Sequence, residues 1–145
     1  MHTVGQILRK KGHDIWSVDP DTTVYEALQM MADKNVGALV VLDNGELVGI
    51  FSERDYARKI VLQGKTSRQT AVREIMTSRV NCVHPEQTTD ECMALMTAKH
   101  IRHLPVLDED ERLVGVISIG DVVKAIISDQ EFVIEQLENY IKGVR

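Results

Sequence analysis

The sequence contains no long hydrophobic run, because its apolar segments all fall short of the roughly 18 residues that a membrane-spanning helix requires. The first residues, Met1–Gly5, lack the apolar core of a signal peptide. We therefore expect a cytoplasmic protein that does not enter a membrane.

Positive charge is also scarce in this sequence. The 145 residues include 17 Lys and Arg against 22 Asp and Glu, which gives a formal net charge of -5. A general nucleic-acid-binding protein is normally basic. The composition therefore argues against a nucleic-acid partner.

Cysteine is nearly absent, and Cys82 and Cys92 cannot form a disulfide framework. Cys82 lies in a strand-like run and Cys92 on one face of a predicted helix, so buried apolar roles are favoured for both. Neither lies in a basic sequence environment that would activate a thiolate nucleophile. No recognisable ligand spacing joins the cysteines to His84, His100 and His103, so we expect no metal site.

The loops of two large enzyme classes are missing as well. The sequence has neither a Walker loop nor a GxGxxG motif. The binding loops typical of phosphoryl transfer and of ordinary hydride transfer are therefore missing. We expect no catalytic residues and interpret the chain as a non-enzyme.

What the sequence does contain is one stretch that occurs twice. Residues 47–55 are LVGIFSERD and residues 113–121 are LVGVISIGD. Each copy is an apolar run with a central glycine, followed by a serine and, three residues later, an aspartate. The run predicts a buried strand. The serine is a good helix N-cap and predicts a helix directly after the strand.

The serine and aspartate of each copy have two interpretations. In the first, Ser52 with Asp55, and Ser118 with Asp121, only form capping boxes at helix N-termini. In the second, the turn offers backbone N–H groups to a phosphate. The carboxylate would then accept hydrogen bonds from the hydroxyls of a ribose. Recurrence of the pair in the same strand context favours a nucleotide site.

The repetition covers nearly the whole chain at an offset of about 65 residues, and its matching elements follow each other in the same order. The predicted pairs are helix Val4–Lys11 with Val72–Met76, strand Ile15–Val18 with Val80–Val83, the helices capped by Thr23 and Thr88, and strand Ala38–Leu42 with Leu104–Leu107. A unit of about 60 residues is marginal alone, so two such units are expected to share one core as a pseudo-twofold pair.

A charged tail, Ser128–Arg145, follows the second repeat. Its apolar residues fall near one face of a predicted helix: Val133, Ile134, Leu137, Ile141 and Val144. Such a helix packs either on the core or on a second subunit, and the sequence leaves both open.

Together these marks resemble the CBS-domain pair, or Bateman module. The resemblance rests on the order of elements, on the run Ile101–Val106, and on the Gly-apolar-apolar-Ser-x-x-Asp ending of each repeat. It covers about residues 3–128 and implies an α/β (α+β) fold of tandem CBS domains, built as two βαββα repeats. We expect CBS domains at 1–64 and 65–128, a C-terminal helix at 129–145, and a stand-alone protein.

The resemblance also implies a function in regulation and signal transduction. Family members bind adenosine-containing ligands in the cleft between the two domains. We take AMP as the first candidate ligand, with ATP, ADP, NAD(H) and S-adenosylmethionine as alternatives. The chain would form a homodimer or a dimer of dimers and would signal to a separate partner protein. The alternative is a structural interaction domain with vestigial sites. The intact serine and aspartate of both repeats argue against this alternative.

Residue by residue, the resemblance assigns phosphate contacts to Ser52 and Ser118 and ribose contacts to Asp55 and Asp121. The expected adenine-flanking residues are Ile15, Val18, Val80 and Cys82. The expected phosphate-side residues are Arg54 and Arg58 in the first repeat, and Arg102, His103 and the following Pro105 in the second.

Two features of the first repeat qualify this assignment. Arg54, Arg58 and the neighbouring Lys59 fit a solvated helix face equally well. Gly37 and Ala38 stand where the second repeat has Arg102 and His103, which leaves room for a larger ligand.

Overall fold

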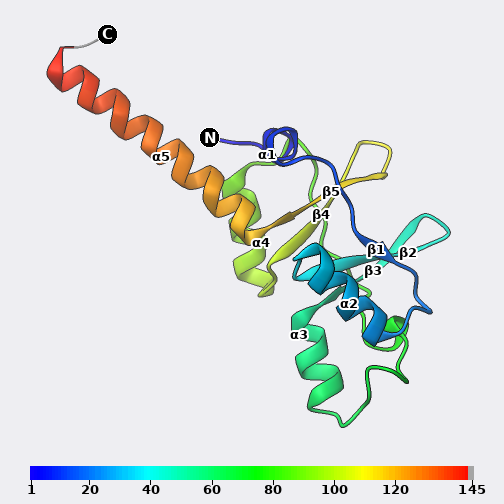
Figure 1. Ribbon diagram of the computed structural model, residues 1–145. Coiled ribbons are helices and arrows are strands. Elements are labelled where there is room, and N and C mark those ends of the chain that lie inside the picture. The colour runs from blue at the N-terminus through cyan, green and yellow to red at the C-terminus, as the bar shows by residue number, and fades with distance from the viewer. Residues whose placement is uncertain (144–145) are drawn as a thin grey trace. The chain divides into compact units, whose positions relative to one another are not determined.

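The computed structural model describes residues 1–143, which form two compact units (Figure 1). The central unit comprises Ile15–Asn81, and the terminal unit combines Met1–Asp14 with Cys82–Arg145. Each unit contains helices and strands, which confirms the predicted α/β fold. This division by packing differs from the sequence repeats, whose expected boundaries and pseudo-twofold packing stay predictions.

The central unit is built on a three-stranded sheet in the order β1-β2-β3. Strand β1 (Ser17–Val18) pairs parallel with β2 (Ala38–Asp43), which pairs antiparallel with β3 (Glu46–Ser52). Helix α2 (Val24–Lys34) connects β1 to β2 and begins at Thr23, whose side chain accepts a hydrogen bond from the Glu26 N–H. The predicted cap at Thr23 is therefore confirmed.

The central unit ends in short helical segments. Helix α3 (Glu53–Asp55) follows the strand as predicted and continues as a π-helix, η1 (Tyr56–Val61). A 3-10 turn, η2 (Val72–Glu74), replaces the helix predicted at Val72–Met76.

The terminal unit is built around one antiparallel hairpin, β4 (His103–Leu107) with β5 (Leu113–Ser118). Helix α1 (Val4–Lys11) has the predicted bounds, and α4 (Thr89–Lys99) begins after the predicted cap Thr88. Helix α5 (Ile119–Lys142) follows β5 without a break.

The strand predicted at Val80–Val83 is wrong. Of these residues only Val83 forms a bridge, which is parallel and pairs it with Val106. The Val83 N–H donates to the Pro105 carbonyl at 3.0 Å, and the Leu107 N–H donates to the Val83 carbonyl at 2.9 Å. The next ladder bond would need an N–H at Pro105, which proline lacks. In the central unit Val40 holds the equivalent position and its N–H donates to the Trp16 carbonyl at 3.3 Å.

The two sequence repeats exchange their short leading segments, so that each unit contains the leading segment of one repeat and the hairpin of the other. Leu8 of α1 packs against Gly115 of β5, where a Cβ would lie 2.7 Å from Leu8 Cδ2. Met76, after η2, packs against Gly49 of β3, where a Cβ would lie 2.6 Å from Met76 Sδ. Each repeated glycine therefore makes room for a side chain from the segment that precedes the other repeat.

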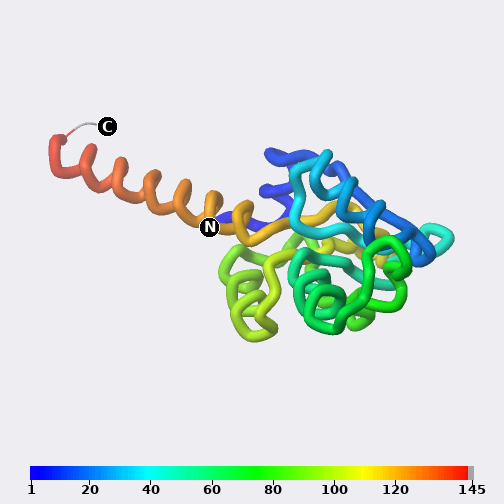
Figure 2. The backbone as a smooth tube through the Cα atoms, turned by 60° about the horizontal axis from the view of Figure 1, so that its bottom comes forward, coloured from blue at the N-terminus to red at the C-terminus, as the bar shows by residue number. Residues whose placement is uncertain are grey.

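The tail prediction is confirmed in its secondary structure, because α5 extends through residue 142. Its apolar side chains from Ile127 onward do not pack on the core: they are exposed, at 54% for Val133 and 81% for Ile141. Val144 lies outside the described residues. Figures 1 and 2 both show the C-terminal half of α5 running away from α1 and α4 of the same unit.

Candidate functional site

The turn between β5 and α5 brings Ser118 and Asp121 together. The Ser118 N–H and hydroxyl donate to Asp121 Oδ2 at 2.8 and 3.1 Å, and the Asp121 N–H donates to Ser118 Oγ at 3.2 Å. The predicted capping box is thus present. It fixes the carboxylate at the N-terminus of a long helix.

A lysine from the other end of the chain reaches the same carboxylate. Lys11 Nζ, at the end of α1, donates to Asp121 Oδ2 at 2.6 Å and to the Val116 carbonyl at 2.7 Å. Burial alone raises the pKa of Asp121, but the hydrogen bonds from Lys11 and Ser118 and the charge of Lys11 outweigh it, so the pKa lies below its ordinary value. Asp121 is therefore an ionised acceptor at neutral pH.

His103 lies beside this group as the cross-strand partner of Ser118. Burial lowers the pKa of His103, and the positive charges of Lys11 and Arg102 lower it further, while Asp121 opposes them. His103 is thus mainly neutral at pH 7 in this structure.

The turn between β3 and α3 has the same capping geometry in the central unit. Asp55 Oδ2 accepts from the Ser52 N–H at 3.0 Å and from the Ser52 hydroxyl at 3.1 Å. Its other oxygen, Oδ1, accepts from the Thr77 hydroxyl at 3.2 Å and lies 3.0 Å from Lys59 Nζ. Asp55 is only 7% exposed.

The two aspartates therefore differ in what they can offer a ligand. Both oxygens of Asp55 are engaged by side chains or backbone of its own unit. The three donors at Asp121 all converge on Oδ2, and its side chain is 19% exposed against 9% for Asp55. Asp121 is the better placed of the two to accept further hydrogen bonds.

The remaining predicted site residues differ in their burial and in their position relative to these turns. Arg102 precedes β4, and its carbonyl accepts from the Ile119 N–H at 2.8 Å. Pro105 is buried in β4. Arg54 and Arg58 have exposed side chains, and Lys59 is the basic residue of this helix whose ammonium contacts Asp55.

The predicted adenine-flanking residues lie mostly outside regular strands. Val18 is buried in β1, whereas Ile15, Val80 and Cys82 are half-buried and precede the strand or bridge of their repeat. Burial and then the charge of Glu111 raise the pKa of Cys82, and burial with Glu91 raises that of Cys92 to about 11. Both cysteines are therefore thiols at neutral pH.

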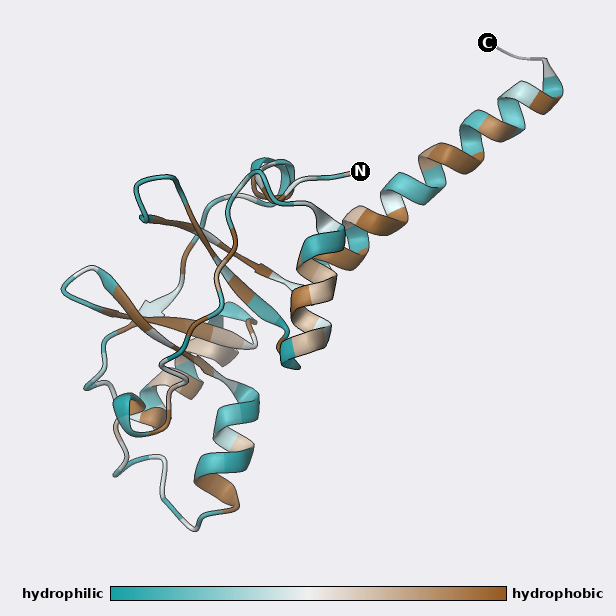
Figure 3. Cartoon of the chain, turned by 180° about the vertical axis from the view of Figure 1, so that it is seen from behind, coloured by the Kyte–Doolittle hydropathy of each residue, from teal (hydrophilic) through white to brown (hydrophobic). Residues whose placement is uncertain are grey.

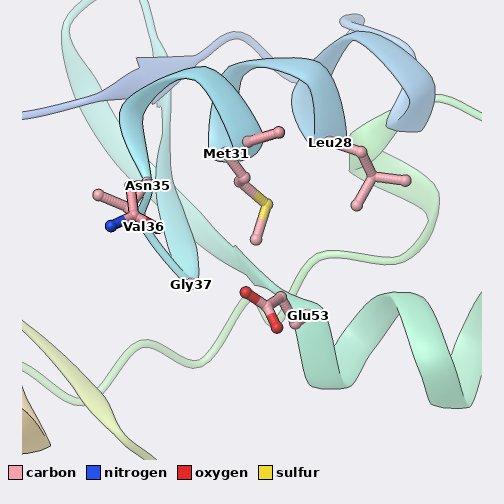
Figure 4. A pocket seen from close by; sticks show the side chains of 7 residues that line it. Leu28, Met31, Asn35, Val36, Gly37 and Glu53 are labelled. Carbon is pink, nitrogen blue, oxygen red and sulfur yellow. The ribbon is translucent and has the colours of Figure 1, made fainter.

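A hollow of about 340 Å³ lies in the central unit between the end of α2 and the start of α3. Apolar side chains from α2, among them Leu28 and Met31, lie across from the Glu53 carboxylate (Figure 4). Gly37 lines the hollow, while the larger ligand expected beside Gly37 stays a prediction. A carboxylate in the wall disfavours a phosphate here, so we assign no phosphate to it.

Sequence reasoning missed two residues that hold the carboxylates, Lys11 and Thr77. Lys11 and Asp121 are 110 positions apart and belong to different repeats, so no local spacing connects them. Thr77 lies 22 positions after Asp55, beyond the range of a helix or turn signal.

Residues 1–143 offer neither a metal centre nor a membrane span. In this part of the chain no three His, Cys, Asp or Glu side chains gather so that they could hold a metal ion. No helix among these residues has the length and apolar character needed to cross a membrane.

Comparisons with known proteins agree with this architecture. The chain is 41% identical over 97% of its length to the CBS domain-containing protein CBSX3, mitochondrial, of Arabidopsis thaliana, of which it covers 72%. A putative signal-transduction protein with CBS domains from Burkholderia ambifaria MC40-6 superposes with a TM-score of 0.85 at 53% identity, over 88% of this chain and 96% of that one.

A second similar structure contains bound ligands. The CBS domain pair of protein MJ0100, in complex with 5-methylthioadenosine and S-adenosyl-L-methionine, has a TM-score of 0.78 and 26% identity, over 89% of this chain and 98% of that one. The CBS domain family itself matches at residues 4–62 and 72–128. The chain therefore belongs to the CBS-domain family and carries two CBS domains.

Proposed function

We propose that this chain is a regulatory, non-enzymatic module that binds an adenosine-containing ligand at the Ser118–Asp121 turn and thereby changes its affinity for a separate partner protein. The observation that carries the proposal is the state of Asp121: ionised, partly exposed, with its three donors on one oxygen. A ribose presents two neighbouring hydroxyl donors, and an ionised carboxylate is their matching acceptor.

The other turn is the weaker candidate for a filled site. A ribose at Asp55 would have to displace the Thr77 hydroxyl or the Lys59 ammonium from a nearly buried carboxylate. That exchange costs hydrogen bonds already made. We therefore assign the Asp55 turn mainly to stability and the Asp121 turn to binding.

A phosphate next to this ribose would meet basic groups of the same unit. Lys11 Nζ already lies 2.6 Å from Asp121 Oδ2, Arg102 directly precedes β4, and His103, a mainly neutral donor or acceptor, begins it. A desolvated phosphate needs charge-assisted donors, which favours a phosphate-bearing ligand, with AMP as the first candidate, over adenosine or S-adenosylmethionine. The roles of Arg102, His103 and Ser118 as phosphate contacts remain predictions, as does the location of the ligand in a cleft between the domains.

Relatives support the ligand class without naming the ligand. The MJ0100 domain pair was solved with 5-methylthioadenosine and S-adenosyl-L-methionine, which share the adenosine group with AMP, ADP, ATP and NAD(H). The cytoplasmic location also stays a prediction, since the Arabidopsis relative is named as mitochondrial.

Titration calorimetry tests the proposal. AMP, adenosine, ADP, ATP, NAD(H), S-adenosylmethionine and GTP would be titrated into the wild type, Asp121→Asn and Asp110→Asn. Asp110→Asn is the matched control, because it removes the same charge from an exposed turn of the same unit. We expect at least about tenfold weaker binding of AMP by Asp121→Asn, equivalent to about 1.4 kcal/mol, and no change in the control.

Two outcomes would contradict the proposal. If Asp121→Asn binds AMP as tightly as the wild type does, Asp121 does not hold the ribose, although the chain still binds a nucleotide. Absence of heat with every adenosine ligand would favour the alternative, an interaction domain with vestigial sites.

A further inference from the structure

The C-terminal half of α5 carries an apolar face that its own unit does not cover. Val122 and Ala125 are the last buried residues of the helix, which continues for 17 residues after Ala125. Figure 3 shows hydrophobic segments recurring along this half. The α5 stripe consists of Ile127 (49% exposed), Val133 (54%), Ile134 (55%), Leu137 (57%), Tyr140 (84%) and Ile141 (81%).

The spacing within the α5 stripe is that of a coiled coil. Ile127, Ile134 and Ile141 repeat every seven residues, and Leu137 follows Ile134 by three. They occupy a and d positions of a heptad, with Gln130 at the other d position. In parallel coiled coils, isoleucine at a combined with leucine at d favours two strands, and a single polar residue in the seam helps to fix register.

The charges beside the stripe select the direction of pairing. Glu131 and Glu138 hold e positions, whereas Val133 and Tyr140 hold g positions. In an antiparallel pair of identical helices e faces e, which would oppose glutamates to each other. In a parallel pair e faces g, so each glutamate meets an apolar or aromatic residue.

The exposed area also fits a second copy. Six large apolar side chains, each exposed by about half or more, present several hundred Å², which is at the upper end of what a typical monomer exposes in one patch. Two such faces would bury on the order of 1,000 Å², the lower bound for a specific interface. The helix continues well beyond the contact of Asp129 with His2, and a helical segment that lacks tertiary packing is itself marginal in water, so pairing would stabilise it.

We propose that the α5 stripe is the surface at which a second copy of this chain binds, through a parallel two-stranded coiled coil of the α5 helices. The interface is independent of the ligand site, because the stripe begins at Ile127, beyond the first turn of α5, which contains Asp121 and is capped by Ser118.

Cysteine cross-linking tests both the pairing and its direction. Ile127→Cys and Ile141→Cys would be made separately in a Cys82→Ser background, while Cys92 stays because it is fully buried. Gln136→Cys is the matched control on the opposite, exposed face. Diamide would oxidise paired thiols to disulfides. We expect covalent dimers on non-reducing gels from each stripe variant alone and none from Gln136→Cys.

The same gels can overturn the proposal. No covalent dimer from either stripe variant would contradict self-association through α5. A dimer that forms only when Ile127→Cys and Ile141→Cys are mixed would show antiparallel pairing and overturn the parallel arrangement.

Sedimentation velocity gives a second readout without cysteines. We expect Leu137→Glu to raise the dissociation constant of the dimer at least tenfold, whereas Gln136→Glu, which adds the same charge one residue away, leaves it unchanged. Equal association of both variants would overturn the proposal. A wild type that stays monomeric up to high concentration would do the same and leave the stripe to a different protein.

Discussion

The central and terminal units hold the same aspartate in different ways. Asp55 divides its contacts between both oxygens and is closed in by Thr77 and Lys59, whereas Asp121 receives Lys11 and Ser118 on one oxygen. The local Ser–Asp geometry is nearly identical in both turns. The difference therefore comes from residues that other segments bring to the carboxylate, and it separates a stabilising role from a binding role.

The sheets differ through a single residue at matching positions. Val40 donates its N–H to the Trp16 carbonyl and extends β1, whereas Pro105 cannot donate and leaves Val83 as an isolated bridge. One missing N–H thus reduces a strand to a bridge and leaves Val80–Cys82 outside the sheet.

The largest expected effect concerns the exchanged segment of the terminal unit. Leu8 is 1% exposed, and Leu8→Ala should lower the free energy of unfolding by about 2–5 kcal/mol. Gly115→Ala should cost about 1–3 kcal/mol through overpacking against Leu8. In the double variant the new methyl group enters space that Leu8 has left. We therefore expect the double variant to lose less free energy of unfolding than the two single variants lose together, with a difference of more than about 0.5 kcal/mol. Urea unfolding measures all three variants.

Lys10→Ala, on the exposed side of α1, is the control and should change stability by no more than about 0.5 kcal/mol. Strictly additive costs in the double variant would mean that Leu8 and Gly115 do not contact each other in solution.

The next effect compares the two carboxylates directly. Asp55→Asn should destabilise the fold by about 1–3 kcal/mol, because one of two buried acceptor oxygens becomes an N–H donor that faces other donors. Asp121→Asn should cost less than about 1 kcal/mol, since its ion pair with Lys11 is partly solvated. Thermal unfolding of both variants measures the difference, and a reversed order would contradict the assigned roles.

A smaller effect is expected from restoring the missing donor. Pro105→Val supplies an N–H that can bond the Asn81 carbonyl and extend the Val83 bridge, as Val40 does in the central unit. The free energy of unfolding should rise by no more than about 1 kcal/mol, which is the net contribution of one hydrogen bond. Amide hydrogen exchange at position 105 is the measurement, and rapid exchange there would show that the strand does not form.

The smallest effect is a pH dependence that only the terminal unit should show. Burial and the charge of Lys11 lower the pKa of His103 below the unfolded value of 6.5, so the unfolded chain binds the proton more readily. Stability should therefore fall as the pH decreases through about 6.5. His103→Gln should flatten this fall in melting temperature between pH 7.5 and 5.5, and an equally steep fall would exclude His103 as its source.

Much of the fold follows from local patterns. The apolar spacing of Val4–Lys11, the caps at Thr23 and Thr88, and the Ser–Asp turns were predictable because each depends on residues within one helical turn. The β2–β3 turn also depends on adjacent residues, because Asn44 and Gly45 are the residue types that tolerate its positive φ, of 51° and 84°. The CBS family assignment depends on these local marks recurring in order.

The sequence by itself determined the two signature turns, their capping bonds and the heptad spacing of α5, since these depend on neighbours along the chain. Only the tertiary structure decided that Lys11 meets Asp121, that Thr77 meets Asp55, and that the apolar face of α5 stays uncovered. Those contacts join residues tens of positions apart, and their occurrence depends on how each unit closes its core. The same Ser–Asp pair is therefore nearly closed in one unit and accessible in the other.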